Sequence, residues 1–246
     1  MENSIEYISL TSLSYALIPA IIALYFLNSW SLNVKRAGYA LCRMLSQLLL
    51  IGYVLNYVFN SENVWLISLI LLAMMCISSW IALNIIQPHR LTLLKYAITA
   101  IFTSSTFILF IVTQGVLNVS PWYQPQVILP LGGMIFATSM NSVSLSAERF
   151  IDEINRHQNY YLARKQALKT ASIPVVNSLF AVGIVSLPGM MTGQILTGVS
   201  PHIAARYQIM VMIMLFSASI IAAVLFLSLL KRVYPEITQT SVNNRV

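Results

Sequence analysis

The sequence predicts an all-α, polytopic integral membrane protein with about seven transmembrane helices. Of its 246 residues, 58% are hydrophobic and 9% are charged, and the mean hydropathy is +0.77. Soluble domains carry about a quarter charged residues. Apolar runs recur along the chain at about 20 residues each, the length that crosses a hydrocarbon core as a helix. We therefore expect residues 1–246 to form a single transmembrane domain.

The predicted spans are residues 8–30, 39–59, 64–86, 96–117, 126–145, a broken segment at 173–199, and 207–230. An odd number of spans places the two termini on opposite sides of the membrane. The first run is too long and too acidic at its start for a cleaved signal peptide, and Lys35 and Arg36 follow it. We expect this span to be retained.

The basic residues orient the chain. All 14 Lys and Arg residues except Arg206 fall at or near one side of this topology, and short loops rich in such residues face the cytoplasm. Glu2, Glu6 and Glu62 fall on the other side. The N-terminus is therefore expected outside and the C-terminus in the cytoplasm. The net charge of +7 reflects this topology, because the basic residues form no aromatic-interleaved patch for nucleic acid.

Several kinds of chemistry are excluded by the residues present. His89, His157 and His202 lie near membrane boundaries on different loops, so neither a haem pair nor an H-E-x-x-H zinc site can form. There is no phosphate-binding G-x-x-x-x-G-K-[ST] motif, so no ATP site is expected in this chain. All seven acidic residues lie outside the apolar cores, which disfavours a proton-coupled carrier.

Residues 187–210, LPGMMTGQILTGVSPHIAARYQIM, place helix-breaking and polar residues between two hydrophobic segments. Irregular backbone at membrane depth is tolerated where it is buried in protein or lines a watery cavity. This stretch is thus the first candidate for a transport path. Its candidate residues are Pro188, Gly189, Met190, Met191, Gly193, Gln194 and Gln208. Thioether sulfurs suit soft metals, which makes Met190 and Met191 candidate metal ligands, although methionine more often fills a core.

Three further polar residues at membrane depth are candidates for the path or its gate. Arg43 and Gln47 stand four residues apart and share a helix face, and Asn177 follows Pro174. The alternative roles are ordinary ones. Arg43 can extend to the headgroups, and the amides can bond neighbouring helices.

The hydrophilic segment 147–170 is expected to be a cytoplasmic helix or a helical extension of the fifth span. It is either a solvated connector or a docking surface for a cytoplasmic partner. The candidate coupling residues are Arg149, Asp152, Glu153, Arg156, Arg164 and Lys165.

Four segments carry a resemblance to a known family. LPGMMTGQILTG followed by ARYQIMVMIML, together with RMLSQLLLIGYVL and QVILPLGGM, resembles the FetB family of ABC transporter permeases, which includes bacterial iron-export and plant aluminium-tolerance permeases. The resemblance implies a homodimeric permease in a bacterial cytoplasmic membrane. A separate ATP-binding subunit would bind ATP and Mg²⁺ and drive the transport of a metal ion, with iron export first, or of a small solute, and the permease itself would bind no cofactor.

The chain departs from the family pattern in two places. Ala137 and Thr138 replace a Gly-Asn pair, and segment 147–170 is shorter and lacks a Leu-Gly-Ala-type coupling segment. Two alternatives to an ABC permease follow from these departures. One is a permease-derived scaffold or regulator, and the other is a gradient-driven carrier without an ATPase.

Overall fold

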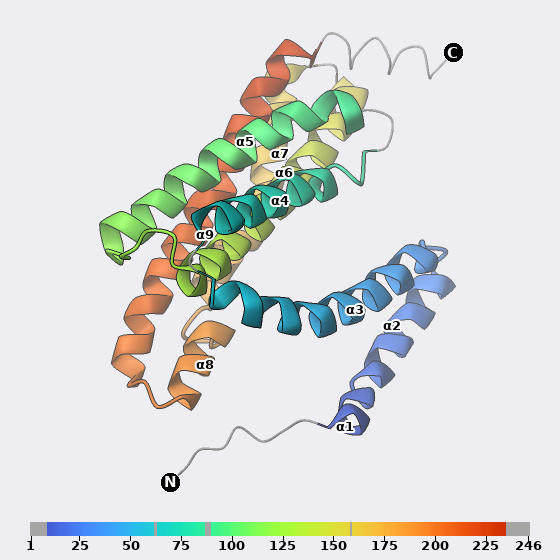
Figure 1. The fold of residues 1–246 in the computed structure, drawn as a ribbon. Helices are drawn as coiled ribbons and strands as arrows, with labels where there is room; N and C mark the ends of the chain where they lie inside the picture. Colours follow the sequence, from blue (N-terminus) through green and yellow to red (C-terminus); the bar gives the residue numbers. More distant parts are fainter. Residues whose placement is uncertain (1–8, 62, 87–89, 158, 235–246) are drawn as a thin grey trace. The chain divides into compact units, whose positions relative to one another are not determined.

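The computed structural model describes residues 9–61, 63–86, 90–157 and 159–234. Within these residues every regular element is a helix, as the sequence predicts (Figure 1). The chain forms two compact units, Met1–Ser61 and Glu62–Val246.

The first unit contains α1 (Leu10–Ser14), α2 (Leu17–Ser29) and α3 (Val34–Phe59). Asn33 caps α3, since its side-chain oxygen accepts a 3.1 Å hydrogen bond from the Arg36 backbone N–H. Helices α2 and α3 contact each other. The stretch Thr11–Ser29, which combines α1 and α2, and helix α3 are each long and apolar enough to cross a membrane, which agrees with the first two predicted spans.

The second unit is a bundle in which α6 (Pro125–His157) is the central helix. It contacts α4 (Val64–Ala82), α5 (Arg90–Phe110), α7 (Tyr160–Ala181) and α9 (Pro201–Leu229), as Figure 1 shows. The final turn of α5 widens into the π-helix η1 (Ile111–Val116), and a 3₁₀ turn, η2 (Leu230–Arg232), follows α9. Of the helices described, α4, α5 with η1, α6 and α9 with η2 are long and apolar enough to cross a membrane.

Two apolar clusters hold this bundle together. The larger contains Phe150, Ile154 and Phe226, which are fully buried among α4, α5, α6, α7 and α9. The smaller surrounds Ile135 and Met214 near the other end of α6. Serines connect the helices within this apolar interior. Their buried hydroxyls bond across α6 and α9, which is a common way of joining helices inside a membrane.

The described residues of segment 147–170 form the end of one helix and the start of the next. Helix α6 continues to His157, and α7 begins at Tyr160 after Asn159, whose side chain accepts a hydrogen bond from the Leu162 backbone N–H. Ala163, Ala167 and Ala171 are buried at four-residue spacing along α7, and small residues at this spacing let two helices approach closely. The expected helical extension of the fifth span is confirmed.

The broken segment at 173–199 is not one continuous helix. Helix α7 ends at Ala181, a turn follows, and α8 (Gly189–Leu196) is only eight residues long. Gly183 adopts a φ of +84° within the turn, a conformation that glycine reaches without strain. Eight residues extend about 12 Å as a helix, too short to cross a bilayer. Helix α8 contacts α9.

Candidate functional site

Three methionines from three helices line one pocket of about 670 Å³ in the second unit. They are Met134 of α6, Met190 of α8 and Met210 of α9. Met134 and Met210 are half-buried, and Met190 is 36% exposed. We call this cavity the methionine pocket. It gathers soft, polarisable sulfur atoms that lie far apart in the sequence.

Polar oxygens line the same pocket. Asn118, Gln124, Gln126 and Tyr207 contribute to its wall. Pro130, also in the wall, lies inside α6 and has no N–H to donate to the Gln126 carbonyl four residues earlier. The methionine pocket therefore combines thioether sulfurs with neutral oxygen acceptors. In the described part of the chain, no three His, Cys, Asp or Glu side chains gather where they could hold a metal ion.

The structure separates the two adjacent methionines proposed from the sequence. Met190 lines the methionine pocket, whereas Met191 is half-buried and is not among the residues of its wall. Neighbouring residues on a helix point about 100° apart, so they reach different surroundings. Sequence reasoning missed Met134 and Met210 as partners of Met190. Met134 is the last residue of the QVILPLGGM segment, and that segment was the sequence signal that could have identified it.

Gln194 and Gln208 carry unsatisfied amide oxygens. The Oε1 atom of each is buried and has no hydrogen-bond partner, and the whole Gln208 residue is 6% exposed. They lie on α8 and α9, which contact each other. A buried acceptor without a partner is costly, so such groups often mark a place where a ligand or water binds. Both residues remain candidates for the path.

The proline and glycine candidates have distinct local roles. Pro188 precedes α8, and its carbonyl accepts the Thr192 hydroxyl at 3.1 Å and the Thr192 N–H at 3.0 Å. A Cβ atom added at Gly189 or Gly193 would meet nothing within 4 Å. Within the residues that the structure describes, these two glycines therefore provide no close helix contact.

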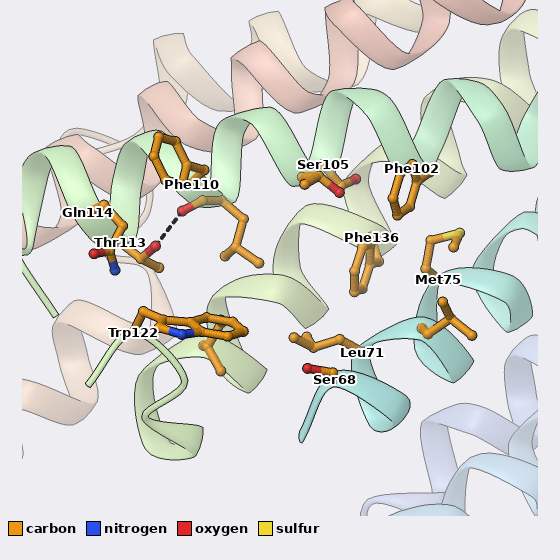
Figure 2. A pocket seen from close by; sticks show the side chains of 14 residues that line it. Ser68, Leu71, Met75, Phe102, Ser105, Phe110, Thr113, Gln114, Trp122 and Phe136 are labelled. Atoms are coloured by element: carbon orange, nitrogen blue, oxygen red, sulfur yellow. Dashed lines mark hydrogen bonds between the residues drawn. The ribbon is translucent and has the colours of Figure 1, made fainter. Parts of the chain in front are cut away.

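A second cavity, of about 580 Å³, lies among α4, α5, η1 and α6. Figure 2 shows Thr113 and Gln114 facing Trp122 at one end, and Phe102, Phe136 and Met75 toward the other. We call it the apolar pocket, since most of its lining is hydrocarbon. Its wall includes residues of the π-helix, a feature often found at functional sites.

A third cavity, of about 250 Å³, lies between α6, α7 and α9 and combines apolar side chains with several hydroxyl and amide groups. Its polar wall consists of Thr138, Asn141, Ser142, Ser178 and Ser219. The predicted path residue Asn177 is exposed, and it is the next residue, Ser178, that lines this cavity. The recurrence of polar residues along one face of α6 was a sequence signal for this cavity.

Arg43 and Gln47 both lie on α3 in the first unit, and both are exposed there. Four residues apart on one helix, they share a face as the sequence indicates. Their part in a path stays a prediction.

The predicted coupling residues gather around the turn between α6 and α7. Arg149 Nη2 lies 2.5 Å from Glu153 Oε1, and Asp152 Oδ2 lies 3.4 Å from Arg149 Nη1 and 3.1 Å from Arg156 Nη2. The Glu153 side chain is 6% exposed, against 60% for Arg156. Arg149 and Glu153 thus form a partly buried pair, whereas the pair of Arg156 with Asp152 is exposed at the surface.

Aromatic rings anchor the start of α7 beside this network. The Tyr160 hydroxyl donates a 2.8 Å hydrogen bond to the Leu227 carbonyl on α9, and its ring packs edge-on against Phe150. The Arg164 guanidinium lies 5.8 Å from the Tyr160 ring centre. Arg164 and Lys165 are exposed. The start of α7 is therefore bound to α9 while it presents positive charge.

The two ends of α6 have different chemistry. Its first half lines the methionine and apolar pockets up to Phe136, and the ion pairs begin at Arg149. Thirteen residues of helix separate these positions by about 20 Å. By the orientation predicted from the basic residues, the pockets lie toward the outside and the ion pairs toward the cytoplasm.

Comparison with known proteins identifies relatives along almost the whole chain. The model of the uncharacterised protein family UPF0014 matches residues 10–234. The UPF0014 membrane protein slr1647 of Synechocystis is 33% identical over 207 residues, which cover 78% of this chain and 80% of that protein. The probable iron export permease protein FetB of Escherichia coli is 31% identical over 236 residues, 87% of both chains.

A plant protein is also similar. Protein ALUMINUM SENSITIVE 3 of Arabidopsis thaliana is 29% identical over 223 residues, covering 83% of this chain and 80% of its own. No solved structure matches. The family match spans both units of the structure and agrees with the resemblance carried by the sequence segments. The chain belongs to the UPF0014 family of multi-pass membrane proteins.

Proposed function

We propose that this chain is the permease subunit of an ABC transporter that exports a metal ion across a bacterial inner membrane. The observation that carries the proposal is the similarity over 87% of the chain to a protein named as a probable iron export permease. Iron is therefore the first substrate to test. The working unit is a homodimer of this chain with two copies of a separate subunit that binds ATP and Mg²⁺.

The chemistry of the second unit supports this division of labour. Its pockets offer neutral oxygen and sulfur ligands, which can bind a cation weakly enough to release it. The turn between α6 and α7 presents Arg156, Arg164 and Lys165. Exposed arginine and lysine side chains suit a partner surface rich in carboxylates. The methionine pocket is the place where we expect the metal to contact the permease.

Affinity purification in mild detergent tests the coupling. The wild-type chain should carry an ATP-binding subunit in stoichiometric amount, and metal ions should stimulate the ATPase activity of the complex. Reversing the charges with Arg156→Glu, Arg164→Glu and Lys165→Glu should lower recovery of that subunit about tenfold or more, because like charges then face each other.

Arg206→Glu is the matched control, since it reverses an exposed basic charge at the opposite end of the bundle. Its recovery of the ATPase subunit should equal that of the wild type. An intact wild-type dimer that brings no ATPase subunit would refute the ABC proposal. In that case, metal uptake by vesicles without nucleotide would identify a gradient-driven carrier, and no transport would leave a scaffold or regulator.

A further inference from the structure

The apolar pocket contains a buried hydroxyl that has no partner. Ser105, on α5, is 1% exposed, and its Oγ atom makes no hydrogen bond. The next residue toward the N-terminus, Ser104, is equally buried, but its hydroxyl donates to the Ile101 carbonyl at 3.2 Å. Of these two serines, only Ser105 lines the pocket. A hydroxyl left without a partner in apolar surroundings costs free energy that a bound polar group would recover.

The rest of the wall limits what can bind. Among the residues described by the structure, no charged side chain lines the pocket. Phe102, Phe136 and Trp122 present aromatic surface, as Figure 2 shows. An ion would lose its hydration here without a countercharge, which is strongly unfavourable. The pocket therefore selects a neutral, mainly apolar molecule.

Other polar groups in the wall are already partly used. The Thr113 hydroxyl donates to the Leu109 carbonyl at 2.8 Å, and Gln114 Nε2 donates to the Val119 carbonyl at 3.4 Å. The first bond joins the π-helix to the end of α5, and the second joins it to the chain that follows. Ser68 and Thr106 also line the wall, but Ser68 is only half-buried and Thr106 is exposed. Ser105 is thus the buried hydroxyl in this wall that a ligand can engage without breaking an existing bond.

We infer that the apolar pocket binds a neutral, mainly apolar molecule whose single polar group hydrogen-bonds Ser105 Oγ. This site is separate from the methionine pocket, and the inference does not depend on metal export or on an ATPase partner. Its volume of about 580 Å³ lies within the range of small-molecule sites. The ligand chemistry is shared by a membrane lipid chain with its ester group and by a free lipophilic solute.

The test uses a matched pair of probes. Phenylnaphthylamine is neutral and carries one N–H donor, and anilinonaphthalene sulfonate has the same ring system with an added anionic group. Energy transfer from Trp122 reports binding when Trp30, Trp65 and Trp80 are replaced by Phe. We expect saturable transfer to the neutral probe, which has at least tenfold higher affinity than the anionic one.

Three variants connect the signal to the pocket. Ser105→Ala should weaken binding of the neutral probe about fivefold, the value of one neutral hydrogen bond. Ser104→Ala should leave it unchanged. Thr106→Phe should abolish saturable binding, because Thr106 lines the pocket at an exposed position and a ring there occupies the cavity without repacking the core. Transfer that does not saturate, or that survives Thr106→Phe, overturns the site.

An equal loss of probe affinity with Ser104→Ala and Ser105→Ala would overturn the role of Ser105. Equal affinity for the neutral and the anionic probe would overturn the role of the uncharged wall. Reconstitution with chain-brominated phospholipid then distinguishes the two sources of ligand. Quenching of Trp122 that Thr106→Phe relieves identifies a lipid chain as the occupant. Quenching that Thr106→Phe does not alter, although the wild-type protein binds the probe, identifies a free solute.

Discussion

The Ser142 hydroxyl on α6 lies 2.5 Å from the Ser219 hydroxyl on α9, and both residues are buried. The hydroxyl of Ser139, three residues earlier on α6, donates to the Ala218 carbonyl at 3.4 Å. These contacts join two long helices that are otherwise packed through hydrocarbon. In a membrane, such polar contacts add directional restraint to packing that is not driven by the hydrophobic effect.

Replacing either serine should loosen the α6–α9 contact. We expect Ser142→Ala or Ser219→Ala to lower the free energy of unfolding by about 1 kcal/mol, because the remaining hydroxyl loses its partner. The double variant should be no less stable than either single one. Unfolding in mixed micelles with increasing denaturing detergent measures this cycle. Additive losses would show that the two hydroxyls do not interact.

The ion pairs at the α6–α7 turn should differ in their contribution to stability. Glu153→Gln should lower the free energy of unfolding by about 2 kcal/mol, because the nearly buried Glu153 carboxylate is the closer of the two acidic partners of Arg149. Arg156→Gln should cost about 0.5 kcal/mol or less, since that pair is largely exposed and screened. Thermal unfolding of the purified protein compares them. Equal shifts of Tm would contradict the burial of Glu153.

Gly132 and Gly133 provide a second matched comparison. A Cβ atom at Gly132 would lie 2.9 Å from Leu71 Cδ2 on α4, whereas one at Gly133 would lie 3.3 Å from the more flexible end of Met74. Both substitutions to alanine gain the same helix propensity. Gly132→Ala should therefore be about 1 kcal/mol less stable than Gly133→Ala. The reverse order would show that α4 does not approach α6 at this glycine.

Much of the helix arrangement could be predicted from the sequence because membrane spans are local features. The run at 64–86 became α4 (Val64–Ala82), which starts beside the capping residue Asn63, and the run at 207–230 became part of α9 (Pro201–Leu229). Helix α9 starts earlier because Pro201 suits the first turn of a helix. Hydropathy identifies only the apolar run, so it omits the polar residues of that first turn.

The pockets could be predicted only in part. Pro188 and Gly189 marked the start of α8, and Met190 was recognised as a possible ligand, because these residues are adjacent in the sequence. The meeting of Met190 with Met134 and Met210 depends on how α6, α8 and α9 pack, for which the sequence contains no local pattern. The unpaired state of Ser105 likewise depends on its neighbours in space.

The geometry of the methionine pocket predicts different results for substitutions at the neighbouring residues Met190 and Met191. Met190→Leu combined with Met210→Leu removes two sulfurs from the wall, and we expect Ag⁺, used as a soft-metal probe, to bind about tenfold more weakly. Met191→Leu is the matched control, because Met191 is outside this wall and its substitution should leave binding unchanged. Leucine conserves the volume of methionine, so each variant should stay folded, with a loss below about 1.5 kcal/mol per site.

Isothermal titration of the purified permease measures the binding without any ATPase, so this prediction is independent of coupling. Metal-stimulated ATPase activity of the complex should fall in the Met190 and Met210 variant and persist in the Met191 variant. Equal Ag⁺ affinity in all three proteins would mean that these sulfurs only fill space. In that case the neutral oxygens, among them the Gln126 carbonyl beside Pro130, would have to hold the cation alone, and harder ions would then be favoured over soft ones.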